Sequence, residues 1–191
     1  MEPDRRQFIA RTALKVLAAE GSRGLTHRAV DTAAGVPAGS TSYYFRTRAA
    51  LLSACLDDLV AQDHDELDVM YPLVTSADPD AMSKALADLL VSWLTTGRER
   101  HTARYELFME AIRRPDLSAV LHRGGMGIRA RVADVLAGLG ADDAEARAHW
   151  LVATLDGVVF DRLAGANAAA PVDRADLLVV AQRLTAGALA P

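Results

Sequence analysis

The segment GVPAGSTSYYF, residues 35–45, gathers hydroxyl side chains and two tyrosines where almost no apolar face is available for burial. Hydroxyl groups bond to phosphate oxygens and base edges, and small residues let a backbone approach a nucleic acid closely. Tyrosine hydroxyls at the end of the segment can reach the flanking backbone. We therefore predict DNA contacts for six residues: Gly39, Ser40, Thr41, Ser42, Tyr43 and Tyr44.

Two further sites, one on each side of this segment, combine a threonine with basic side chains. Thr26 precedes His27 and Arg28, and Thr47 precedes Arg48, each at the expected start of a helix. Cations are unfavourable near a helix N-terminus, whereas a bound phosphate is favourable there. Capping threonines and surface arginines are common, but two such sites flanking one polar segment favour DNA. We add Thr26, His27, Arg28 and Arg48 to the predicted DNA contacts.

Three helices must position these residues. Apolar residues recur at helical spacing from about residue 5 to Gly21, which is placed to end the first helix with a positive φ. Thr26 and Gly35 are predicted to cap the two ends of a short second helix. A third short helix is expected over residues 38–44, followed by Phe45 in the core. Two short helices joined by a glycine-containing turn form a helix-turn-helix, whose second helix enters the DNA major groove.

The order LTHRAVDTAAGVPAGSTSYYFRTRAALL, residues 25–52, resembles the N-terminal signature of the TetR family of bacterial transcriptional regulators. The family pattern commonly has tyrosine where Ser42 stands and lysine where Arg48 stands. The resemblance implies an all-α homodimer, in which a three-helix DNA-binding domain precedes a larger helical domain for ligand binding and dimerisation. It also implies a repressor that an unidentified small-molecule effector releases from a palindromic operator in double-stranded DNA. Activation in place of repression stays open.

Composition agrees with an all-α fold. The chain has 191 residues and 51% hydrophobic content, with no run that alternates like a strand. The net charge is −4, yet residues 1–50 hold eight basic and four acidic residues, which suggests that this part binds a polyanion. We predict a helix-turn-helix domain over residues 1–47 and a ligand-binding and dimerisation domain over residues 48–191.

The second domain offers two apolar stripes and a set of large side chains. The resemblance assigns the stripes to the dimer interface, whereas without it an intrachain core would be the simpler interpretation. The stripes are Leu151, Leu155, Val158 and Val159 on one helix and Leu177, Leu178, Ala181 and Leu184 on the next. A ligand pocket needs aromatic walls and a few polar anchors. Candidates for it are Trp93, Tyr105, Phe108, Met109, Trp150 and Asp156.

Other classes of protein have weaker support. No zinc-protease, P-loop or nucleophile-elbow motif occurs, so we expect no catalytic residue, no metal and no cofactor. The run from Gly125 to Ala130 fits a loose dinucleotide pattern but no β-rich segment precedes it. The acidic run Asp63 to Glu66 is interpreted as a solvated face, and Cys55 as a small buried side chain. A helical partner-binding protein without DNA activity remains an alternative.

No apolar run reaches a membrane-spanning length, and residues 1–8 lack a secretory signal. We therefore expect a cytoplasmic protein without a membrane partner.

Overall fold

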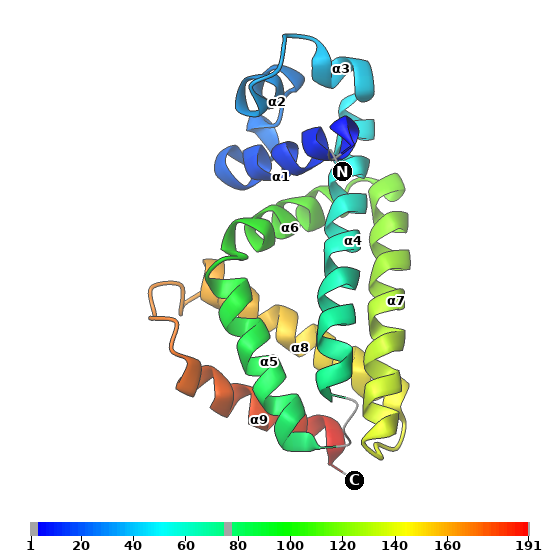
Figure 1. Ribbon diagram of the computed structural model, residues 1–191, viewed down its shortest axis with the longest axis vertical. Coiled ribbons are helices and arrows are strands. Elements are labelled where there is room, and N and C mark those ends of the chain that lie inside the picture. The colour runs from blue at the N-terminus through cyan, green and yellow to red at the C-terminus, as the bar shows by residue number, and fades with distance from the viewer. Residues whose placement is uncertain (1–3, 75–77, 191) are drawn as a thin grey trace. The chain divides into compact units, whose positions relative to one another are not determined.

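A computed structural model describes residues 4–74 and 78–190, and every regular element in these ranges is a helix (Figure 1). The predicted all-α fold is confirmed. The helices are α1 (Arg5–Gly24), α2 (His27–Ala34), α3 (Ser40–Tyr44), α4 (Arg48–Val74), α5 (Pro79–Leu94), α6 (Arg98–Ala111), α7 (Pro115–Gly138), α8 (Ala144–Ala164) and α9 (Arg174–Leu189).

The chain forms two compact units. The first contains residues 1–62 and 99–124, and the second contains residues 63–98 and 125–191. Helices α4 and α7 each have residues in both units, because the boundaries between the units fall inside these two helices. The predicted division at residue 47 into a DNA-binding and a ligand-binding domain concerns function and stays a prediction.

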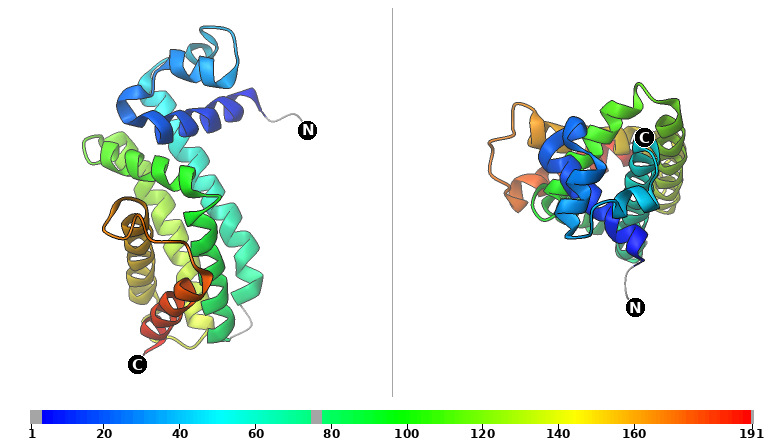
Figure 2. Two further views of the ribbon diagram at one scale, coloured as in Figure 1. Left: turned by 90° about the vertical axis from the view of Figure 1, so that its left-hand side faces the viewer. Right: turned by 90° about the horizontal axis from the view of Figure 1, so that it is seen from above.

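The first unit has a core built from α1, α2, the start of α4 and part of α6. α1 packs against α2, and α2 packs against α3 (Figures 1 and 2). Phe45, directly after α3, is completely buried, as predicted, and the Arg6 guanidinium lies 5.0 Å from its ring centre. Cys55 is also completely buried, and burial raises the pKa of its thiol to about 12. The prediction of a buried cysteine is therefore confirmed.

Most predicted helix ends are correct to within a few residues. Thr26 caps α2, since its hydroxyl accepts a hydrogen bond from the Ala29 amide, and Gly35 ends α2 in the left-handed conformation. Gly21 has φ +69°, as expected, but helical hydrogen bonding resumes beyond this kink and reaches Gly24. The third helix begins at Ser40, two residues later than predicted.

The start of α4 is tied to the end of α1 and to α6 within the first unit. The Arg48 guanidinium donates to the carbonyl oxygens of Leu25 and Ser22, the latter at 2.6 Å. Ser22 in turn donates its amide to Glu106 at 2.9 Å and its hydroxyl to Glu110 at 3.1 Å. Charged hydrogen bonds of this kind are stronger than neutral ones, so α6 holds the kinked end of α1 in place.

The second unit is built mainly on α5 and α9, which pack together, and α8 contacts both (Figure 1). The predicted dimer stripes lie inside this unit. Leu151, Leu155 and Val159 of α8 are buried within the chain, and so are Leu177, Ala181 and Leu184 of α9. Val158 and Leu178 are half-buried. The chain's own core covers the six buried residues, so their assignment to a dimer interface is wrong, whereas the assignment of Val158 and Leu178 stays a prediction.

Helix α7 continues without a break through Gly124, Gly125 and Gly127. The dinucleotide-like run from Gly125 to Ala130 thus lies inside a helix and not after a strand, as that motif would require. Gly124 allows α7 to approach α4 closely, because a Cβ atom there would lie 2.7 Å from a methyl carbon of Val60.

We predict that Gly124→Ala destabilises the protein by about 1 kcal/mol or more. Alanine favours a helix over glycine by up to about 1 kcal/mol, but overpacking typically costs about 1–3 kcal/mol. Gly138→Ala is the matched control, since a Cβ there meets nothing within 4 Å and should leave stability unchanged or slightly raised. Thermal unfolding of both variants measures the difference. Equal stabilisation by the two changes would contradict the proposed contact.

Candidate nucleic-acid interface

Asp31, near the end of α2, holds the N-terminus of α3. Its side chain is only 5% exposed. One carboxylate oxygen accepts the Gly39 amide at 2.7 Å, and the other accepts both the amide and the hydroxyl of Thr41, at 2.7 and 2.6 Å. A helix N-terminus carries unpaired N–H groups and positive potential. The carboxylate satisfies these donors and fixes the direction of α3 relative to α2.

The environment of Asp31 favours its charged form. Burial alone would raise the pKa of the carboxyl, but the hydrogen bonds from Thr41 and Gly39 and the nearby positive charge of His27 outweigh that effect. The pKa is therefore lowered from its ordinary value of 3.8. A carboxylate that accepts several N–H and O–H bonds is expected to behave in this way.

Three of the predicted DNA contacts are instead engaged within the protein. Thr41 is completely buried and donates its hydroxyl to Asp31, so the prediction of a DNA contact through this side chain is wrong. His27 bonds through Nε2 to the Phe45 carbonyl at 2.6 Å; because a carbonyl only accepts, the ring nitrogen is the donor. Arg48 uses its donors on Leu25 and Ser22. We interpret His27 and Arg48 as residues that position the helices.

The other predicted contacts leave a surface available to an external partner. Thr26, Arg28, Gly39 and Ser42 are exposed, and Tyr43 is 79% exposed. Ser40 is half-buried and donates to the Pro37 carbonyl at 2.6 Å. Tyr44 is also half-buried, and its ring meets the Tyr43 ring edge to face at 5.1 Å. Their contacts with DNA stay predictions.

Among the exposed residues, Gly39 has a backbone conformation that glycine adopts far more easily than other residues. Gly39 has φ +94°, in the region that L side chains rarely adopt, and a Cβ there would meet nothing within 4 Å. Glycine is therefore required for backbone conformation, and the space beside it is open to an incoming molecule. That space lies directly before the first turn of α3.

Sequence reasoning missed two residues of this region. Arg46 is exposed and follows α3 by two positions, beside the exposed Thr47. A basic residue next to the tyrosine pair was a usable signal, but Arg46 was only counted in the local charge. Asp31 was counted as an acid and was not linked to Thr41, because an interaction over ten residues leaves no periodic pattern.

The predicted ligand-pocket residues are divided between the units. Tyr105, Phe108 and Met109 lie on α6 in the first unit, where Tyr105 and Phe108 stack edge to face at 6.0 Å. Trp93, Trp150 and Asp156 belong to the second unit. The Trp93 indole N–H donates to Glu66 at 2.9 Å, and Trp150 is 46% exposed on α8. The assignment of these six residues to one pocket stays a prediction.

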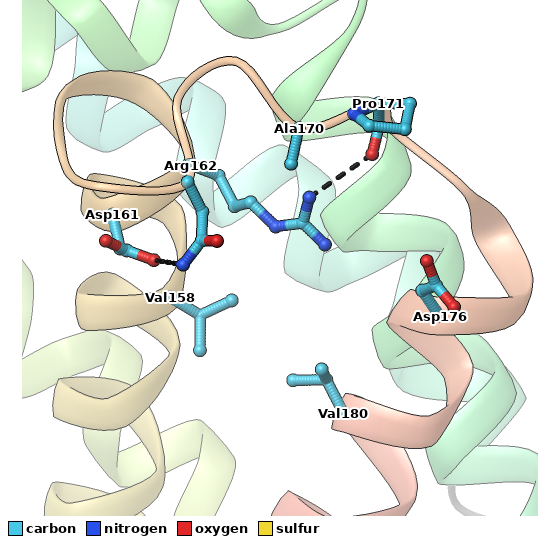
Figure 3. A pocket seen from close by; sticks show the side chains of 8 residues that line it. Val158, Asp161, Arg162, Ala170, Pro171, Asp176 and Val180 are labelled. Carbon is cyan, nitrogen blue, oxygen red and sulfur yellow. Dashed lines mark hydrogen bonds between the residues drawn. The ribbon is translucent and has the colours of Figure 1, made fainter.

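A different hollow of about 340 Å³ lies between α8 and α9, under the loop that joins them (Figure 3). Val158 and Val180 point toward one another from the two helices (Figure 3). Arg162 donates to the Pro171 carbonyl at 3.2 Å, and Asn167 donates to Asp161 at 2.6 Å. Ala170 and Asp176 complete the lining.

Within the described residues, no three metal-ligating side chains lie together. Nor does any helix in these ranges have the length and apolarity needed to cross a membrane.

Comparison with known proteins supports one interpretation of this geometry. Residues 77–187 match the family described as Tetracyclin repressor-like, C-terminal domain. The multidrug binding protein EbrR complexed with ethidium is 33% identical, with 96% of this chain and 99% of that chain covered and a TM-score of 0.69. EbrR structures with proflavin and malachite green are also similar, at 33% and 32% identity. No curated protein sequence matched the chain.

Two further solved structures resemble the chain over nearly its whole length. A member of the TetR family from Streptomyces coelicolor A3 is 33% identical, with 95% of this chain and 98% of that chain covered and a TM-score of 0.73. A putative TetR-family regulator from Mesorhizobium loti has a TM-score of 0.81 at 17% identity, with 97% and 96% covered. At 17% identity, the second match supports only the assignment of the fold.

We predict that Asp31→Asn destabilises the first unit by about 1–3 kcal/mol, because the amide offers one acceptor where the carboxylate offers two. The lowered pKa means that the carboxylate stabilises the fold fully above about pH 4 and loses this effect as pH falls through the folded pKa. The difference in the free energy of unfolding between the parent protein and Asp31→Asn should therefore shrink as the pH falls below about 4.

Hydrogen exchange at the Gly39 and Thr41 amides, followed with pH, measures this effect locally. Asp4→Asn is the control, since Asp4 caps α1 through one exposed hydrogen bond and asparagine caps helices equally well. Unchanged exchange at both amides in Asp31→Asn would rule out the positioning role.

Proposed function

Because the chain belongs to the TetR family of transcriptional regulators, we propose that it acts as a homodimeric repressor that a small-molecule effector releases from a palindromic operator. The proposed DNA-contacting surface, defined as Thr26, Arg28, Gly39, Ser40, Ser42, Tyr43, Tyr44 and Arg46, lies on α2, α3 and the residues that flank them. A regulator acts where the chromosome lies, so we place it in the cytoplasm. We assign it no catalytic role.

One observation carries the DNA-binding proposal. Internal partners satisfy the N-terminus of α3 and leave the side chains of Ser42 and Tyr43 exposed. A partner-binding surface without DNA activity would not need this arrangement beside Arg28 and Arg46. The small exposed residues allow close approach to a groove, and the arginines provide charge for phosphates or base edges.

Selection from random duplexes tests this proposal, and the site it recovers should be palindromic. Arg28→Ala should weaken binding to that site by about 1–3 kcal/mol if the guanidinium reads a base, and weaken it equally on all sequences if it holds a phosphate. Lys84→Ala on α5 is the control, since it removes an exposed side chain of the same charge from the second unit, away from the outer face of α8 and α9. Titrations at several salt concentrations separate the two roles. Recovery of no sequence above background would contradict the proposal.

Dimerisation is proposed through the outer face of α8 and α9, in place of the buried stripes. This outer face comprises Trp150, Ala153, Gly157 and Ala164 of α8 with Val179 and Ala186 of α9, and all six residues are exposed. Gly157 stands inside a helix, where glycine costs up to about 1 kcal/mol relative to alanine. A Cβ there would meet nothing within 4 Å in its own chain. Close approach of a second copy would give this glycine a packing role.

We predict that Gly157→Arg converts the dimer to a monomer, because a charged side chain would be buried between two copies. The monomer itself should fold normally, since the site is open in the isolated chain. Gly138→Arg places the same side chain at another open glycine of the second unit and should leave the dimer intact. Sedimentation of both variants decides the matter, and a dimeric Gly157→Arg protein would contradict this interface.

For the effector we propose an aromatic cation. Ethidium, proflavin and malachite green are aromatic cations, and EbrR, which binds them, is about one third identical to this chain. The Trp93 indole beside the Glu66 carboxylate supports the assignment, because aromatic faces and carboxylates both attract cations.

Ethidium should therefore release the protein from its selected site. Fluorescence of ethidium reports binding to protein alone, and anisotropy of labelled DNA reports release, with a neutral aromatic of similar size as the control. Because ethidium also binds duplexes, the release assay needs a parallel titration with free DNA. Ethidium that fails to bind the protein would contradict this effector class and leave the DNA-binding proposal standing.

A further inference from the structure

The two ends of the α8 and α9 pair differ in shape. The helices run in opposite directions, since Arg147 near the start of α8 donates to the Ala188 carbonyl of α9, and Arg162 near the end of α8 donates to Pro171 before α9. The partly exposed Trp150 lies toward the first end. The hollow lined by Val158 and Val180 lies toward the other end (Figure 3). One end thus carries a large, partly exposed aromatic side chain, and the other carries a hollow.

Trp150 is an unusual residue to leave exposed. Its indole is 46% exposed, and the ring leans on α9 so closely that a Cβ at Gly187 would lie 2.8 Å from it. Tryptophan is among the side chains that most often contribute strongly to association when a partner buries them. Contact with Gly187 holds the ring in place before any partner arrives, which lowers the entropy lost on binding.

The spacing of residues on α8 favours one orientation of a second copy. Trp150 and Ala164 are each seven residues from Gly157, so all three lie on one side of the helix. If two copies of α8 cross in opposite directions at Gly157, each tryptophan faces the small Ala164 of the other. In the parallel arrangement the two tryptophans would face each other, and small residues would face small residues. Antiparallel pairing therefore gives the better packing.

We propose that the hollow between α8 and α9 receives the indole of the partner subunit's Trp150. A two-fold axis near Gly157 repeats this contact, so each subunit both supplies a tryptophan and receives one. This inference rests on the proposed homodimer and specifies its register. A cavity of about 150 Å³ holds a benzene ring, so a hollow of about 340 Å³ has room for an indole.

The lining of the hollow suits this occupant. Val158 and Val180 give an apolar floor, and the Arg162 guanidinium can stack on an aromatic face. Carboxylates of Asp161 and Asp176 at the rim can accept the indole N–H. The lining thus offers apolar contact, a cation for the aromatic face and an acceptor for the indole N–H of a tryptophan.

Trp150 fluorescence in a Trp93→Phe background tests the proposal, because Trp150 is then the only tryptophan. Its emission should be blue-shifted in the dimer and move to the red on dilution to monomer. Val180→Phe should fill the hollow from its own chain and weaken dimerisation by about tenfold or more. Val180→Ala is the matched control, which enlarges the hollow and should keep Trp150 shielded.

Trp150→Phe should retain more of the dimer affinity than Trp150→Ala, since a smaller ring still enters the hollow. The register is wrong if the dimer forms but Trp150 emits as in the monomer and Val180→Phe leaves the dimer affinity unchanged. That outcome would leave the homodimer standing. Sedimentation that shows only monomer at all concentrations would overturn the homodimer and this inference with it. Circular dichroism confirms in each case that the variant is folded.

Discussion

The carboxylate of Asp31 is the group on which the proposed DNA-contacting surface depends. Helix α3 has only five residues, far fewer than an isolated helix needs to be stable in water. Its first amides are satisfied from α2, across a turn that contains Gly35 and Gly39. The hydroxyl of Thr41 bonds to the same carboxylate, and the Phe45 carbonyl after α3 bonds to His27. Both ends of the short helix are therefore held by α2.

This arrangement explains why neighbouring residues have opposite roles. Thr41 is completely buried, whereas Ser42 and Tyr43 beside it are exposed, because a five-residue helix has one face on the protein and the other free. Within the same unit, Arg48 of α4 and Glu110 of α6 both bond to Ser22, so α4 and α6 are joined at the end of α1. The surface proposed to contact DNA thus rests on charged hydrogen bonds that lie entirely inside the first unit.

Much of this could be predicted from the sequence where the signal is local. The cap at Thr26, the stop at Gly35 and the buried Phe45 each follow from residue type and helical spacing. The roles of Thr41, His27 and Arg48 could not be predicted in this way, because their partners lie 10 to 26 residues away in the chain. Residue type and position in the expected helices suggested DNA contacts for all three.

The stripes on α8 and α9 show the same limit for apolar residues. Helical periodicity correctly identified Leu151, Leu155 and Leu177 as members of apolar faces, but periodicity does not say which neighbour covers a face. The chain's own core covers them. The face left over carries an exposed tryptophan and an interior glycine, and neither stands out in a hydrophobic pattern.

The most direct test of the central claim is photo-cross-linking from position 43 in the complex with the selected duplex. A photoreactive amino acid in place of Tyr43 should cross-link to DNA. The same group in place of Ile112, which is 74% exposed and directly follows α6, should not. Cross-links from position 112 and none from position 43 would contradict the assignment of α3 to the DNA.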